Sequence, residues 1–192
     1  LPYNGVVYGF SGVALPQDGG FALVGNTNAS DVGEIVRLIK ALAEFENEPA
    51  SSVKVTEADL LRDGFGDPGD GAGNFIPRFE CLIAEHDGKA VGICLFFHNY
   101  STWEGRAGLY IEDLFVEDHV RGLGLGRALM AAVARTALER NCARLDLSVL
   151  DWNPTRAFYD QINMAHMATW RPYRMAHADI AALAQGTPEI AH

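Results

Sequence analysis

Apolar residues recur every three or four positions over residues 32–45, a spacing that predicts an amphipathic helix with one buried face. The apolar positions are Val32, Ile35, Leu38, Ile39, Leu42 and Phe45. Ser30 or Asp31 could cap this helix, and Glu34 follows Asp31 at the spacing of a capping box. A strand is predicted before the helix, over residues 21–24, and a second, short helix after it, over residues 56–62.

Three apolar runs, over residues 79–85, 89–98 and 109–116, predict strands of an antiparallel meander. The Asp87-Gly88 pair between the first two runs is typical of a tight hairpin turn.

The remaining elements alternate between helix and strand. Residues 125–140 predict a helix whose apolar stripe fades toward a basic end, as the helix dipole favours. Residues 145–150 predict a strand, 155–161 a short helix, and 165–175 a final strand pair or a bend. The element order predicts an α/β (α+β) fold whose mixed central sheet has antiparallel N-terminal strands and is flanked by helices.

The chain of 192 residues suits one domain, which we place at residues 20–176. Residues 1–19 are rich in glycine, proline and aromatics without a clear period, and we treat them as an N-terminal appendage of unknown role. Residues 177–192 form a C-terminal tail that could contain a short helix.

Composition narrows the class of partner. Acidic residues outnumber basic ones 25 to 15, and the formal net charge of −10 argues against nucleic acid and anionic membranes and favours small cationic ligands. No apolar run has the roughly 18 residues of a membrane span. The cysteines Cys81, Cys94 and Cys142 are widely spaced, as in reduced cytoplasmic proteins, and neither they nor the histidines have metal-ligand spacing. We therefore predict a cytoplasmic protein with no metal, no nucleic-acid partner and no membrane contact.

The most informative segment is a glycine-rich loop between a predicted strand and a predicted helix. It consists of Arg121, Gly122, Leu123, Gly124, Leu125 and Gly126. Glycines let the main chain bring successive N–H groups to an anion, and the following helix adds its N-terminal partial positive charge. The alternative is a tight turn that binds nothing. A Walker A loop is excluded by its missing lysine, and a dinucleotide fingerprint by the three antiparallel strands that precede the loop.

The order of strand, glycine loop, helix, strand, Asn153 and a short helix with Phe158-Tyr159 resembles the GNAT superfamily of acyl-CoA-dependent N-acetyltransferases. Segments 45–46, 56–66, 101–103, 110–116 and 151–153 are similar to the spermidine/spermine (diamine) acetyltransferases and their thialysine-acetylating relatives. The resemblance implies the GNAT fold, acetyl-CoA as cosubstrate, and a homodimer with substrate sites near its interface. It implies coenzyme contacts from Leu114, Phe115, Val116, Arg121, Gly122, Leu123, Gly124, Leu125, Gly126, Arg127 and Asn153.

Acyl transfer to an amine requires a proton acceptor. An alkyl amine with a pKa of about 10.4 is protonated at pH 7 and must lose a proton before its nitrogen can attack a thioester. Glu112 and Asp113 lie in an otherwise apolar strand just before the loop, and they point to opposite faces unless a β-bulge intervenes. We predict that Glu112 is the general base, directly or through water. The alternative is that both acids cap an exposed edge or pair with Arg121.

The leaving thiolate requires a proton donor, and a phenol with a pKa of about 10 can supply one. Tyr159 is the predicted general acid, although its pairing with Phe158 would also suit a core aromatic. Asn163 stands where the family commonly has a turn glycine. Asparagine tolerates left-handed backbone angles, so the turn could be kept.

The resemblance also implies a substrate site made of Phe45, Glu46, Trp103, Glu112 and Asp113. Trp103 can offer a cation–π face to an ammonium group, or it can simply pack. Glu46 could equally belong to the solvated acidic run 44–48. Ser101 replaces an additional acid of the spermidine/spermine enzymes, which favours a shorter amine or an amino acid with an ω-amino group.

These observations predict transfer of an acetyl group from acetyl-CoA to a small cationic amine, either a diamine, a polyamine or a thialysine-like amino acid. The transfer is expected to be direct, within a ternary complex. The alternatives are a protein lysine or aminoglycoside acetyltransferase, and a non-catalytic sensor module that binds acyl-CoA.

Overall fold

The computed structural model describes residues 15–17, 20–66 and 75–186. The chain divides into two compact units, Leu1–Asn153 and Pro154–His192, and each forms a structural unit of its own. None of the helices in the described ranges has the length and apolar character needed to cross a membrane.

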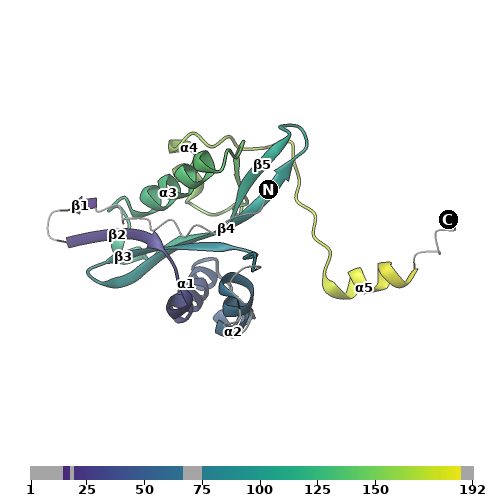
Figure 1. The fold of residues 1–192 in the computed structure, drawn as a ribbon, viewed down its shortest axis with the longest axis horizontal. Coiled ribbons are helices and arrows are strands. Elements are labelled where there is room, and N and C mark those ends of the chain that lie inside the picture. The colour runs from purple at the N-terminus through teal and green to yellow at the C-terminus, as the bar shows by residue number, and fades with distance from the viewer. Residues whose placement is uncertain (1–14, 18–19, 67–74, 187–192) are drawn as a thin grey trace. The chain divides into compact units, whose positions relative to one another are not determined.

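A six-stranded sheet forms the centre of the first unit, with the spatial order β1-β2-β3-β4-β5-β6 (Figure 1). The strands are β1 (Leu15–Gln17), β2 (Gly20–Asn26), β3 (Glu80–His86), β4 (Lys89–Ser101), β5 (Arg106–Val116) and β6 (Leu145–Leu147). Neighbours from β1 to β5 are antiparallel, whereas β6 runs parallel to β5. The predicted mixed sheet with antiparallel N-terminal strands is confirmed, and β1, which lies inside residues 1–19, pairs with β2.

The turn between β3 and β4 has the chemistry that its sequence predicts. Asp87 and Gly88 have φ values of 52° and 73°. A two-residue turn with positive φ at both positions matches the twist of the two strands, and asparagine, aspartate and glycine adopt it most readily.

Helices cover both faces of the sheet (Figure 1). α1 (Val32–Phe45) and α2 (Glu57–Leu60) lie on one face, and α3 (Leu125–Glu139) lies on the other. α1 buries Val32, Ile35, Val36 and Leu38, which pack with Cys81, Ile83, Ile93, Leu95 and Phe115 of the sheet. The predicted helix over residues 32–45 and its buried face are confirmed.

The start of α1 differs from the prediction. Asn28 accepts a hydrogen bond from Ser30 N (2.8 Å), and Asp31 accepts one from Asn28 N (2.7 Å). This capping box closes a 3₁₀ turn, Ala29–Asp31, that precedes α1. Asp31 makes no side-chain capping bond to α1, so the predicted box of Asp31 with Glu34 is wrong. The extra turn moves the cap three residues upstream, which the helical period alone does not reveal.

The C-terminal part of the chain has less strand than predicted. β6 ends at Leu147. Residues 165–175 are turn and coil, so of the two predicted alternatives, a final strand pair or a bend, the strand pair is wrong. A strand leaves its backbone groups unpaired unless a second strand lies beside it, and the described residues of the second unit supply none. The short helix is confirmed as α4 (Arg156–Gln161), and α5 (His177–Gly186) lies in the predicted tail.

Candidate active site

The glycine loop turns back on itself immediately before α3. Gly122 and Gly124 have φ values of 84° and 82°, and Gly124 is the N-cap of the helix. A β-carbon at either position would meet nothing within 4 Å, so space is open beside the loop. The first N–H groups of a helix have no partner inside it, and they point toward this space together with the positive end of the helix dipole. The arrangement can bind an anion.

Side chains around the loop contribute unequally to this anion site. Phe115 and Leu125 are buried in the core, so they can offer only their backbone groups. Leu114, Val116, Leu123 and Gly126 are partly buried, whereas Arg127 is exposed on the first turn of α3. Asn153, at the end of the first unit, is buried.

Arg121 is held by its own loop. Its Nε donates to the carbonyl of Val116 (3.0 Å), and its Nη2 lies 2.8 Å from Oδ1 of Asp118. The guanidinium stacks over the ring of Phe45, 4.3 Å from the ring centre. Arg121 therefore does not pair with Glu112 or Asp113, and the alternative that these acids exist to balance Arg121 is wrong. Instead it links the loop to the end of α1.

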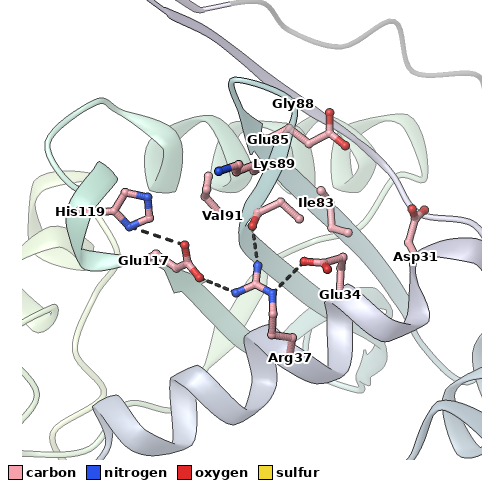
Figure 2. Close-up of a pocket in the computed structure, with 11 residues that line it drawn as sticks. Asp31, Glu34, Arg37, Ile83, Glu85, Gly88, Lys89, Val91, Glu117 and His119 are labelled. Atoms are coloured by element: carbon pink, nitrogen blue, oxygen red, sulfur yellow. Dashed lines mark hydrogen bonds and ion pairs between the residues drawn. The ribbon is translucent and has the colours of Figure 1, made fainter.

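A second link joins α1 to the segment that enters the loop. Figure 2 shows Arg37 of α1 between Glu34 and Glu117, with distances of 2.8 and 2.5 Å, while its third contact is the carbonyl of Ala90 (2.6 Å). These residues line a cavity of about 590 Å³, and none of the predicted site residues lines it. The cavity is separate from the candidate site, and Arg37 anchors the start of the loop.

A β-bulge interrupts the regular pairing of β5 with β4 at the two acids. Leu95 pairs with Asp113 and Phe96 with Ile111, so Glu112 is an extra residue on β5. Leu95 belongs to the core cluster beneath α1, which places Asp113 on the α1 face of the sheet. Glu112 is exposed and Asp113 is partly buried. The bulge that the sequence left open is therefore present, and it falls on the predicted base.

Three carboxylates meet near the end of α1. Burial, together with the charges of Glu112 and Glu46, raises the pKa of Asp113 to about 6. Burial and the nearby Glu48 raise the pKa of Glu46. Glu46 is partly buried, so it is not merely one of a run of solvated acids. A cation beside these carboxylates favours their ionised forms, and it would so offset the burial and the like charges that raise the pKa of Asp113.

Trp103 does not join this cluster within one chain. It lies in the turn that connects β4 and β5, and 89% of its surface is exposed. Because Glu112 is an extra residue, β5 advances from Arg106 to Asp113 only as far as β4 does from Ser101 to Leu95, which is about 20 Å at roughly 3.3 Å per residue. The predicted substrate set therefore divides into Phe45, Glu46, Glu112 and Asp113 on one side and Trp103 at the hairpin tip.

Tyr159 belongs to the second unit, where it lies on α4 with its ring edge-on to Phe158, 5.5 Å between ring centres. Asn163 ends this segment with φ of 62°, which confirms that asparagine supports the left-handed turn.

Comparison with known proteins identifies the family. A model described as the acetyltransferase (GNAT) family matches residues 39–164. The chain belongs to this family. It is 38% identical to the thialysine N-epsilon-acetyltransferase of Bos taurus over 141 residues, which are 69% of this chain and 77% of that one. It is 32% identical to the human spermidine/spermine N(1)-acetyltransferase-like protein 1 over 170 residues, 83% of this chain and 23% of that one.

A solved structure supports the GNAT fold. An integron cassette protein from the mobile metagenome of V. cholerae superposes with a TM-score of 0.67 at 22% identity, covering 86% of this chain and 98% of that one. This likeness and the family match confirm the predicted fold, and the family match and the curated relatives confirm the acetyltransferase class.

Sequence reasoning missed a hydrogen-bonded group at the other end of β5. It consists of Asn99, Ser101, Arg144 and Asp146, which come from β4, β6 and the residue before β6. A polar Asp146 within an otherwise apolar strand was the available signal.

The raised pKa of Asp113 predicts a pH-dependent effect of Asp113→Asn on stability. The folded-state pKa of about 6 lies above the ordinary value of 3.8. The carboxyl's contribution to the free energy of unfolding is therefore fully present below pH 3.8 and is lost as the pH rises through 6. This difference corresponds to about 3 kcal/mol at most. In urea unfolding, Asp113→Asn should be more stable than the wild type at pH 8, by up to this amount. At pH 4 the two proteins should have nearly the same free energy of unfolding.

Asp87→Asn, at the exposed β3–β4 turn, is the control for the same chemical change. If Asp113→Asn were equally destabilising at both pH values, the ionised Asp113 carboxyl would not destabilise the fold, and the raised pKa of Asp113 would be wrong.

The loop geometry predicts loss of coenzyme binding on Gly124→Val. Valine at a φ of 82° is strained, and its branched side chain would occupy the open space beside the loop. We expect the Kd for acetyl-CoA, measured by calorimetry, to rise more than tenfold. Gly105→Val, at a φ of 63° in the exposed hairpin tip, adds the same strain elsewhere and should leave this Kd within twofold. Equal effects of the two variants on Kd would contradict the anion site.

Proposed function

We propose that this acetyltransferase moves the acetyl group of acetyl-CoA onto the terminal amine of a small cation of the thialysine or diamine type. The observation that carries the proposal is the acidic group made of Glu46, at the end of α1, and of Glu112 and Asp113 on β5, the strand that leads into the glycine loop. The relatives named above, which act by their names on thialysine or on spermidine and spermine, support the same substrate class.

The coenzyme would be held by backbone groups more than by side chains. The N–H groups of the loop and of the first turn of α3 suit its pyrophosphate, because they are donors that no helical bond uses. β5 pairs with β6 only through Leu109–Ile111, so the edge of its last residues, Leu114–Val116, faces no strand of the described chain. This edge suits the amide groups of the pantetheine arm, and Arg127 and Asn153 complete the set by resemblance.

Glu112 is the proposed base. It is the extra residue of the bulge and is exposed, so a substrate amine or a water molecule can reach it. It takes a proton from the ammonium group, and the freed lone pair forms the new nitrogen–carbon bond. Asp113 and Glu46 would hold the cation while this happens. Because the pKa of Asp113 is about 6, Asp113 can also accept a proton at neutral pH and is the second candidate for the base.

Tyr159 is the proposed acid by resemblance. As the carbon–sulfur bond breaks, the electron pair leaves on sulfur, and the phenol protonates the thiolate. After the carbon–nitrogen bond has formed, the nitrogen loses its second proton, which returns to the Tyr159 phenolate directly or through water. Coenzyme A therefore leaves as a thiol, the amide is neutral, and the proton held by Glu112 is the one proton released to solvent. No covalent acyl-enzyme is required.

A homodimer would explain the position of Trp103. Its distance along β5 from Asp113 is too great for both residues to contact one short amine in the same chain. The exposed hairpin tip of a second copy could bring Trp103 to the acids, where its ring would face the ammonium group.

Ser101 adds no acid to the substrate site. Its side chain is buried, and its Oγ accepts from Glu104 N and from Arg144 Nη1, both at 3.2 Å. It therefore offers no charge to a distant second or third amine. This arrangement favours a short diamine or an ω-amino acid over spermine.

A panel of amines tests the proposal. Acetyl-CoA consumption should be measured with thialysine, lysine, ornithine, 1,3-diaminopropane, spermidine, spermine, an aminoglycoside and a lysine peptide. We expect the highest kcat/KM with a short amine, and at least tenfold less with spermine, the aminoglycoside and the peptide. Preference for the peptide or the aminoglycoside would favour the alternative enzymes. Tight coenzyme binding without turnover of any amine would favour a sensor module.

Glu112→Gln separates chemistry from binding in the same assay. It should lower kcat by about 10²- to 10⁴-fold, the usual contribution of a general base, while the KM for the amine changes little. Asp113→Asn should instead act mainly on that KM. If only Asp113→Asn lowers kcat, Asp113 is the base and the assignment of Glu112 is wrong.

A further inference from the structure

β5 and β6 form a fork whose branch point lies immediately before the bulge. Their pairing covers Leu109 to Ile111 on β5 and ends at Leu147 on β6, while β5 continues to Val116. The last side-chain link across the two strands is Tyr110 Oη, which donates to Ser148 Oγ at 2.8 Å. Beyond this link the strands no longer pair, so whatever fixes β6 against β5 also fixes the width of the opening beyond it.

Asn99, on β4, connects this neighbouring strand to β6 across β5. It lies on β4, opposite Gly108 of β5, yet its Nδ2 donates to Oδ2 of Asp146 on β6 at 2.9 Å. The side chain therefore crosses over β5 to reach the strand beyond it. The crossing depends on Gly108, because a β-carbon there would lie 2.5 Å from Asn99 Oδ1, closer than its 3.1 Å to Cγ and to the carbonyl oxygen of Arg144.

Arg144 closes the group into a ring. Its Nε lies 2.7 Å from the same Oδ2 of Asp146, and its Nη1 donates to Ser101 Oγ, back on β4, at 3.2 Å. β4 is thus tied to β6 twice, through Asn99 and through Arg144. We call Asn99, Ser101, Gly108, Arg144 and Asp146 the fork clamp.

The clamp is not built for stability alone. Asn99 Oδ1 is buried and, among the described residues, has no hydrogen-bond partner. A buried carbonyl oxygen without a partner is unfavourable, so the Asn99–Asp146 bond is obtained together with a cost to folding. Removing the Asn99 side chain removes both the hydrogen bond and the unpaired carbonyl oxygen, so the net change in the free energy of unfolding should be small.

We propose that Asn99 is a positioning residue for the coenzyme, because its bond to Asp146 fixes β6 against β5 and so sets the opening of the fork. This inference rests on the proposed function, in which the edge of β5 beyond the fork receives the pantetheine arm. Asn99 does not contact the reacting atoms in this account.

Asn99→Ala tests the clamp directly. We expect the KM for acetyl-CoA to rise about tenfold, with kcat changed less than threefold and Tm changed by less than about 3 °C. Gly108→Ala should give the same pattern, because its β-carbon displaces the Asn99 amide. The double variant should be no worse than either single one, because both changes remove the same bond.

Two further variants serve as control and as replacement. Arg106→Ala, in the same hairpin, breaks a hydrogen bond to Asn141 and should leave the KM for acetyl-CoA within twofold. Asn99→Asp keeps the shape but puts a carboxylate beside Asp146. Its KM for acetyl-CoA should rise at least as much as that of Asn99→Ala, because an ionised carboxylate cannot donate a hydrogen bond to Oδ2 of Asp146.

The outcomes separate the clamp from the proposed function. An active wild type whose KM for acetyl-CoA is unchanged by Asn99→Ala, or an Asn99→Ala variant that only loses Tm, would overturn the clamp and leave the function standing. Additive effects of Asn99→Ala and Gly108→Ala would also overturn it. A folded wild type that neither binds nor consumes acetyl-CoA would refute the proposed function, and the clamp with it.

Discussion

One extra residue in β5 decides which side chains meet at the candidate site. In a regular strand, Ile111 and Asp113 would lie on the same face, because side chains alternate with a period of two. The bulge at Glu112 puts them on opposite faces: Ile111 pairs with Phe96, and Asp113 with Leu95 beneath α1. The acidic part of the site follows from this switch, because it brings Asp113 to Glu46 and leaves Glu112 exposed.

The cost of this arrangement is electrostatic, and a cationic ligand relieves it. Burial and two neighbouring acids hold the pKa of Asp113 near 6, and no basic side chain is among the causes that shift it. Arg121, the nearest candidate by sequence, is instead held by Asp118, by the carbonyl of Val116 and by the ring of Phe45. The coenzyme loop and the acids are therefore joined through the end of α1, while their charges stay separate.

The sequence predicted those parts of the fold whose signal is local. The helix over residues 32–45, the Asp87-Gly88 turn and the sharp turn of the glycine loop depend on periodicity or on backbone sterics, which neighbouring residues reveal. The sequence could name the bulge only as one possibility. The alternation of side chains within one strand does not show the register of its pairing with the next strand. The fork clamp and the separation of Trp103 from Asp113 depend on strand register and length, which no single segment encodes.

Burial and two nearby carboxylates raise the pKa of Asp113, and a bound amine should lower it again. Titration of the Asp113 carboxyl tests this most directly. The ¹³C resonance of the Asp113 carboxyl, assigned with Asp113→Asn, should be followed against pH with and without a saturating short diamine. We expect a pKa of about 6 in the free protein and a clear decrease when the diamine binds, because a nearby cation favours the ionised form. An ordinary aspartate pKa in the free protein, or one that the diamine does not move, would contradict it.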